Sequence, residues 1–259
     1  MKKAIVAVLV AVLLTSGLLV GCQGGVIKGS GNLKTENFNF SDFTRVDVSS
    51  AFEVDIAQSG SYSISITADD NLFKYIQVSR QGETLKIGLK TFTLLWPATL
   101  KAKITMPQLR GLNLSGATRG TVSGFSSTEN LDIEVSGASS LDLVGMSVGD
   151  VKFDISGASK VTGDITAGDA DFDISGASTV QLEGSADDMV VEADGASRVK
   201  LAGFTVNNAN VNLSGASTGT VNLDGKLDAN LSGASKLEYI GEPTMGTVNT
   251  SGASTLSKK

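Results

Sequence analysis

The 259-residue sequence predicts an all-β fold, a parallel β-helix in which short coils of chain stack into a solenoid. A tetrapeptide of the form Ser-Gly-Ala-Ser recurs eight times with small changes, and its glycines are residues 116, 137, 157, 176, 195, 215, 233 and 252. Apolar and polar residues alternate before each tetrapeptide, which is typical of a half-buried strand. The chain also has 30 glycines and only 5% aromatic residues, a composition that suits many turns.

Residues 1–21 are expected to be the signal peptide of a lipoprotein. Two lysines precede an apolar run over residues 4–14, which is shorter than the roughly 20 residues that a membrane-spanning helix needs. The segment Leu19-Val20-Gly21-Cys22 resembles the lipobox of bacterial lipoproteins, in which the cysteine is acylated and becomes the N-terminus after cleavage. We therefore expect Cys22, the only cysteine, to anchor the chain to a membrane outside the cytoplasm. In a cell with two membranes, this would be the outer membrane or the cell surface.

The charge balance excludes several classes of partner. After cleavage before Cys22 the chain would carry 19 basic against 27 acidic residues, a net charge near −8. Such a chain has no electrostatic reason to bind nucleic acid or anionic lipid. It has no histidine, and so lacks the usual general base and the commonest transition-metal ligand. We expect neither a cofactor nor a nucleic-acid partner.

Residues 22–37 are expected to form a tether and a first strand. Residues 38–108 are expected to form an N-terminal β part that continues or caps the solenoid. A short helical turn is predicted at residues 70–76 and a hairpin-like turn at Gly82. Alternating residues predict four strands in this part, at 45–48, 52–56, 62–66 and 85–89.

The segment Phe92–Pro97 is apolar and irregular, and it holds Trp96, the only tryptophan. Pro97 has no backbone N–H group, which excludes a central strand. Trp96 is either a plug over the first coils or an exposed contact for a partner or a membrane. We favour the plug, because stacked coils need capped ends.

Residues 109–259 are expected to form the repeat β-helix, with two short strands per repeat. The residues one and three positions before each tetrapeptide are predicted to point inward, as Ile155 and Phe153 do in the third repeat. Each coil would rise ~4.8 Å. At each corner the glycine supplies a positive φ, the alanine stacks on the next alanine, and the hydroxyl groups bind the backbone of the turn.

Three further segments, together with the repeats, resemble the head GIN domain family of putative adhesins from bacterial envelopes. These segments are Asp70–Ile76, Gly82–Ile87 and Met106–Leu109. The resemblance covers most of residues 38–259. It implies a right-handed β-helix, and it brings no catalytic residues.

One outward row of candidate site residues is acidic. Glu134, Asp154, Asp173 and Glu192 would stack on consecutive coils, where neighbouring carboxylates repel by on the order of 1 kcal/mol. A cation site is one interpretation, and the acid cluster of a polysaccharide lyase or hydrolase is another. We favour a solvated anionic face that keeps a sheet-rich protein soluble, and so predict neither a metal site nor a catalytic residue.

A second outward row follows the tetrapeptides and alternates basic with hydroxyl residues. Its basic members would lie ~9.6 Å apart, near the screening length of physiological salt. Charge spacing is the simpler interpretation, and a sulfated or acidic glycan lying along the row is the functional alternative. The row consists of Arg119, Ser140, Lys160, Thr179, Arg198, Thr218, Lys236 and Thr255.

The sequence therefore predicts a non-enzymatic, lipid-anchored envelope protein. Its β-helix face would bind or adhere to a glycan or an envelope protein outside the cytoplasm. Two alternatives remain open. One is a carbohydrate-active enzyme that uses the acidic row, and the other is a structural spacer without a ligand.

Overall fold

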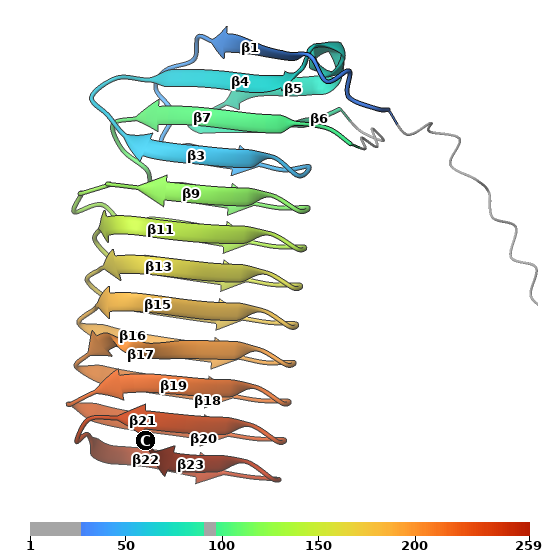
Figure 1. Cartoon of the computed structure of the whole chain (residues 1–259). Helices are drawn as coiled ribbons and strands as arrows, with labels where there is room; N and C mark the ends of the chain where they lie inside the picture. Colours follow the sequence, from blue (N-terminus) through green and yellow to red (C-terminus); the bar gives the residue numbers. More distant parts are fainter. Residues whose placement is uncertain (1–26, 91–96) are drawn as a thin grey trace, which may run out of the picture.

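The computed structural model describes residues 27–90 and 97–259, and it shows two β-sheets facing each other along a solenoid (Figure 1). The 12-stranded sheet is called the first sheet. Its spatial order is β1 (Leu33–Phe38), β4 (Ser63–Asp69), β7 (Leu100–Met106), β3 (Glu53–Gln58), β9 (Arg119–Ser123), β11 (Ser140–Ser147), β13 (Lys160–Thr166), β15 (Thr179–Ser185), β17 (Arg198–Val206), β19 (Thr218–Leu223), β21 (Lys236–Ile240) and β23 (Thr255–Lys258).

The 11-stranded sheet is called the second sheet. The predicted parallel β-solenoid is confirmed, because each repeat supplies one strand to each sheet and the repeat strands pair in parallel. The order of the second sheet is β22 (Thr244–Thr250), β20 (Lys226–Leu231), β18 (Asn208–Leu213), β16 (Asp188–Ala193), β14 (Ala170–Ile174), β12 (Val151–Ile155), β10 (Leu131–Val135), β8 (Gly111–Leu114), β2 (Arg45–Val48), β6 (Thr84–Leu89) and β5 (Ile76–Gln81).

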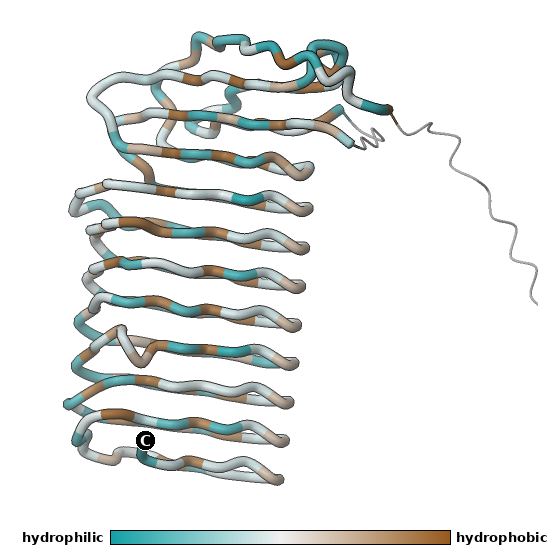
Figure 2. The backbone as a smooth tube through the Cα atoms, viewed as in Figure 1, coloured by the Kyte–Doolittle hydropathy of each residue, from teal (hydrophilic) through white to brown (hydrophobic). Residues whose placement is uncertain are grey.

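The alternating residues of the repeat strands form the core between the sheets. In β10, β12 and β14, every second side chain is buried and those between are exposed. Figure 2 shows the same alternation as brown and teal segments along the chain. In-register pairing places like residues on one another, so that the rings of Phe153 and Phe172 stack with centroids 4.9 Å apart. Phe204 meets Phe172 edge-on at 6.3 Å.

The tetrapeptide forms the corner between a strand of the second sheet and the next strand of the first sheet. Its eight glycines have φ between 68° and 78°, as predicted. The coils approach closely here, since the Ala177 N–H donates to the carbonyl oxygen of Gly157 at 2.8 Å. A β-carbon on Gly176 would lie only 2.4 Å from that same oxygen. Glycine is therefore required both by the backbone angle and by the neighbouring coil.

The last residue of the tetrapeptide points inward, which the pattern alone did not predict. The side chains at this position are buried in seven consecutive corners, and the alanines beside them are exposed. Some hydroxyl groups bind the turn backbone as expected, for example Ser159 to the carbonyl oxygen of Ser156 at 2.8 Å. The hydroxyl groups of Ser139, Ser178 and Ser217 are buried without a hydrogen-bond partner among the described residues.

The N-terminal part both continues and caps the solenoid. The strands β2 and β3 form a further coil that pairs in parallel with β8 and β9. Ser50 and Ala51 occupy its corner with φ of 71° and 63°, in place of the usual glycine. Beyond this coil, β5 pairs with β6, and β4 with both β1 and β7, in antiparallel fashion. The predicted helical turn is the 3-10 helix η1 (Asp70–Tyr75), which buries Leu72.

No helix in the described part of the chain is long and apolar enough to cross a membrane. Two predicted features, the lipidation of Cys22 and the plug at Trp96, lie outside the described residues.

Candidate functional site

The two outward faces of the solenoid differ in charge. In the second sheet, β10, β12, β14 and β16 carry seven Asp and Glu residues against one lysine, all exposed. In the same coils of the first sheet, β11, β13, β15 and β17 carry three acidic and three basic residues. The strands of the second sheet therefore carry a net negative charge in these coils, whereas those of the first sheet are balanced.

The predicted acidic row is present on the second sheet. Glu134, Asp154, Asp173 and Glu192 are consecutive register partners on four parallel strands. The row continues at both ends as amides: Asn113 donates to Glu134 at 2.7 Å, and beyond Glu192 the register partner is Asn212. The four carboxylates are exposed. None is packed among apolar groups, as a carboxyl group that serves as a general acid commonly is.

An open groove of about 490 Å³ lies beside the C-terminal half of this row. Carboxylates line one end, and amides that bond to one another line the other, since Asn230 donates to Asn212 at 2.9 Å and Asn249 to Asn230 at 2.8 Å. Among residues 27–90 and 97–259, no group of three or more His, Cys, Asp or Glu side chains is arranged to hold a metal ion.

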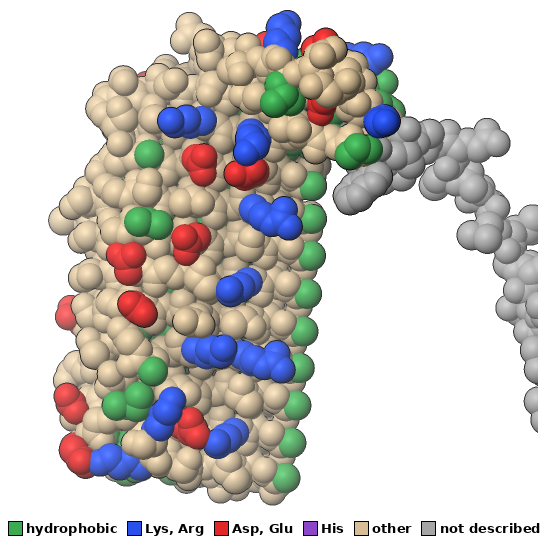
Figure 3. Space-filling model, viewed as in Figure 1, with side chains coloured by type: hydrophobic (Ala, Val, Ile, Leu, Met, Phe, Trp, Pro, Cys, Tyr) green, Lys and Arg blue, Asp and Glu red, His purple; other side chains and the backbone are tan. Residues whose placement is uncertain are grey.

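The predicted basic row is present on the first sheet. Its eight residues are register partners on β9, β11, β13, β15, β17, β19, β21 and β23. Figure 3 shows this face, with Lys and Arg side chains gathered along the side next to the tetrapeptide corners. Cations stand on every second coil, and the hydroxyl residues between them complete a single straight row.

Ion pairs involve Lys236 near one end of the basic row and Glu53 just beyond the other end. Lys236 bonds to Glu238 at 2.6 Å, and this bond holds the pKa of Glu238 below its ordinary value. At the other end Glu53, the register partner of Arg119, is bonded to Lys101 at 3.0 Å. In the described part of the chain, no carboxylate pairs with the other three cations of the row, which are Arg119, Lys160 and Arg198.

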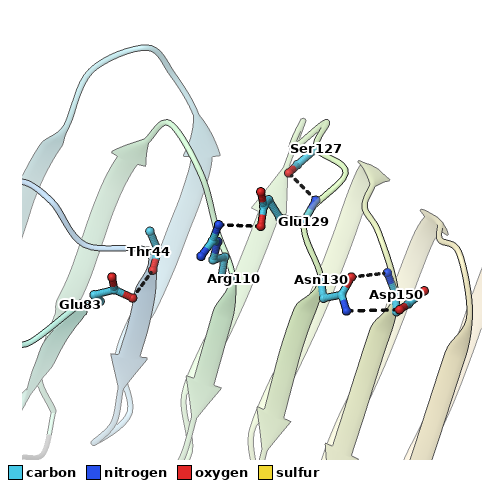
Figure 4. Close-up of polar contacts among 7 residues, drawn as sticks. All are labelled: Thr44, Glu83, Arg110, Ser127, Glu129, Asn130 and Asp150. Carbon is cyan, nitrogen blue, oxygen red and sulfur yellow. Dashed lines mark hydrogen bonds and ion pairs between the residues drawn. The ribbon is translucent and has the colours of Figure 1, made fainter.

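A third ladder lies at the opposite corner, and the sequence reasoning missed it. Each member accepts a hydrogen bond from a backbone N–H of the next coil: Asn130 from Asp150 at 3.0 Å, Asp150 from Asp169 at 3.0 Å, and Asp169 from Asp188 at 3.2 Å. Figure 4 shows its first step, beside the Arg110–Glu129 ion pair of 2.6 Å. In the sequence, the ladder is marked by an Asp or Asn six residues before the tetrapeptide. These side chains hold neighbouring coils together, so the role of the ladder is structural.

A buried carboxylate joins the tether to the cap. Asp69 is 4% exposed, and its two oxygens accept from the N–H groups of Thr99 at 2.8 Å and Gly31 at 2.7 Å. These hydrogen bonds hold the pKa of Asp69 below its ordinary value, against the opposing effect of burial. Only glycine fits at position 29, because a β-carbon there would lie 2.4 Å from an oxygen of the same carboxylate.

The comparisons with known proteins agree with this architecture. The family described as "Putative auto-transporter adhesin, head GIN domain" matches residues 42–243. No curated protein matches the chain.

Solved structures match the fold closely at low identity. A putative adhesin from Parabacteroides merdae has a TM-score of 0.81 at 20% identity, covering 90% of this chain and 98% of its own. Another from Parabacteroides distasonis has a TM-score of 0.83 at 18% identity, covering 91% and 100%. A putative lipid binding protein from the same species has a TM-score of 0.78 at 19% identity, and the match covers 91% of this chain and 100% of that protein. Identities this low show a shared fold and nothing more.

Proposed function

The chain belongs to the head GIN domain family of putative auto-transporter adhesins, and from that membership we propose a non-enzymatic, lipid-anchored protein of the cell envelope. It acts outside the cytoplasm by presenting a flat face of its solenoid to a partner. The observation that carries this proposal is the form of the two faces: rows of outward side chains that parallel pairing holds in register from coil to coil.

The solenoid is suited to hold a binding face away from a membrane. The 12 strands of the first sheet, spaced ~4.8 Å apart, make a stack about 50 Å long. The N-terminal cap and the last coil are at opposite ends of it (Figure 1). An anchor at Cys22 would therefore attach the capped end, and the repeats would project outward.

Two other activities receive less support. A polysaccharide-cleaving enzyme would need the acidic row to act as acid and base, but its four carboxylates are all exposed on one open face. One structural neighbour is described as a lipid binding protein. Binding of a lipid between the sheets is not supported here, because Phe153, Phe172 and Phe204 fill the space between them.

Metabolic labelling with a fatty-acid analogue tests the anchor. The wild-type chain should be labelled and recovered with the membrane, whereas Cys22→Ser should lose the label, because no other thiol is present. Gln23→Ser changes the neighbouring residue and should be labelled like wild type. Labelling of Cys22→Ser at the wild-type level would contradict the proposed anchor.

A further inference from the structure

The spacing of charge along the first sheet is regular enough to constrain a ligand. Arg119, Lys160 and Arg198 follow one another at every second coil, so their backbone positions are ~9.6 Å apart. All three side chains are exposed. Because they stand on parallel strands joined by hydrogen bonds, the spacing is built into the sheet and does not depend on loop conformation.

Two carboxylates on the strands of this row accept hydrogen bonds from groups other than the three cations. Asp142 accepts a hydrogen bond from Thr162 at 2.9 Å, and Asp164 accepts one from the Gly145 N–H at 2.7 Å. No carboxylate in the described part of the chain pairs with the three cations, so they are available to an external anion. A ligand that meets them must also avoid these neighbouring carboxylates, and a narrow chain lying along the row does so.

The spacing argues against two common polyanions. Duplex DNA carries one charge per ~1.7 Å of axis, and each strand one per ~3.4 Å, so most of its phosphates would face no cation on this row. An anionic membrane would cover the whole face at once. Its headgroups would then also meet Asp142, Asp164 and Glu183, which lie on the same strands as the cations or between them.

The residues between the cations favour a ligand with neutral units between its charges. Ser140 and Thr179 alternate with the three basic residues, and each offers a hydroxyl group that both donates and accepts. In an extended polysaccharide, two sugar units have a length comparable to two coils. A chain that alternates an acidic sugar with a neutral one would therefore place each charge at a cation and each neutral sugar at a hydroxyl residue.

We propose that this row binds a linear acidic glycan with one negative charge per disaccharide, lying parallel to the solenoid axis. The carboxylate or sulfate groups accept hydrogen bonds from Arg119, Lys160 and Arg198. The neutral sugars contact Ser140 and Thr179. This inference rests on the proposed function, since it names the partner of the presented face.

The test uses the chain from residue 23, which keeps every described strand, and hyaluronan oligosaccharides, which carry one carboxylate per disaccharide. Calorimetry should show an affinity that rises with length until three disaccharides are present and then levels off. Each single change of Arg119, Lys160 or Arg198 to Gln should weaken binding about fivefold, and the triple change about a hundredfold, because well-separated contacts are additive. Lys152→Gln, which removes one charge from the opposite sheet, is the matched control and should bind like wild type.

The spacing itself is tested by Thr179→Lys, which puts cations on three consecutive coils. This change should strengthen binding of densely sulfated heparin more than binding of hyaluronan, where the added cation meets a neutral sugar. An equal gain for both would overturn the matched spacing. No binding of hyaluronan, wild-type affinity in the triple variant, or binding only to vesicles with phosphatidylglycerol would overturn the site. None of these outcomes affects the proposed anchor, which fatty-acid labelling tests separately.

Discussion

The corner glycines give the sharpest test of the solenoid. Gly176→Ala adds one methyl group at a residue with φ of 75°, where its carbon would lie 2.4 Å from the Gly157 carbonyl oxygen. The left-handed backbone costs an alanine about 1–2 kcal/mol. The overlap is with backbone and can be relieved only by moving the coils apart. That movement lengthens the 2.8 Å hydrogen bond from Ala177 to Gly157, and losing one or two such bonds costs about 1 kcal/mol each.

The expected total for Gly176→Ala is therefore about 2–4 kcal/mol. Gly124→Ala is the matched control, because Gly124 has φ of 73° but no atom within 4 Å of its added carbon. It should cost only the backbone component, about 1–2 kcal/mol. For a domain of this size the melting temperature should fall by about 10 °C in Gly176→Ala and by about 5 °C in Gly124→Ala.

Thermal unfolding followed by circular dichroism measures both variants. Hydrogen exchange adds a local readout, since the amide of Ala177 should lose protection before the amides of distant coils. Equal melting temperatures for the two variants would show that the contact between coils contributes nothing. A wild-type melting temperature for Gly176→Ala would contradict both the positive φ of Gly176 and its close contact with Gly157.

Two further predictions concern buried polar groups. Ser178→Ala should leave stability unchanged or raise it by about 1 kcal/mol, because the buried hydroxyl group of Ser178 has no partner among the described residues. Ser197→Ala should lower stability by about 1 kcal/mol, because it removes the 2.6 Å hydrogen bond from the Ser197 hydroxyl group to the backbone carbonyl oxygen of Asp194. Urea unfolding measures both, and a change of the same sign in each would refute the assignment. The lowered pKa of Asp69 adds stability that is present above the pKa of the unfolded chain and is lost as the pH falls through the folded value. The stability difference between wild type and Asp69→Asn should therefore be constant from pH 7 to about 5 and shrink below about 4, and a difference that stays the same at pH 3 would contradict it.

The repeats could be predicted closely because one physical cause acts at each coil. Alternation at Phe153 and Ile155 fixed which residues face inward, and the spacing of the tetrapeptides fixed the register. The two outward rows follow from that register, so the acidic and basic rows were predicted residue by residue. The ion pairs that neutralise some of these charges could not be predicted, since a pair such as Lys236 with Glu238 depends on side-chain conformation.

Both strands of the first coil were predicted, but its corner was missed because it lacks the motif that marks the others. Ser50 and Ala51 adopt positive φ at the position where glycine is usual, at a local cost of about 1–2 kcal/mol each. Parallel pairing of β2 with β8 and of β3 with β9 holds them there. The predicted hairpin-like turn at Gly82 is present between the antiparallel strands β5 and β6. The pairing of β4 with β1 and β7 was not predicted, since alternation within β4 indicates a strand but not the direction in which it pairs.

The inward position of the last tetrapeptide residue has a similar explanation. The chain turns through the corner, so the period of two that orders the strands does not extend across it. Ser178 is buried while Ala177 is exposed, the reverse of what polarity alone suggests. The carboxylate of Asp69 was missed because its partners, Gly31 and Thr99, are distant in sequence and contribute only backbone groups.

Attachment of cells to a hyaluronan-coated surface tests most directly whether an anchored solenoid presents a glycan-binding row. Cells that display the wild-type chain should attach, and cells with Cys22→Ser should not, because the released chain no longer links cell to glycan. Cells with Arg119, Lys160 and Arg198 all changed to Gln should display the same amount of protein yet fail to attach. Attachment of that triple variant at the wild-type level, with equal display, would contradict the account.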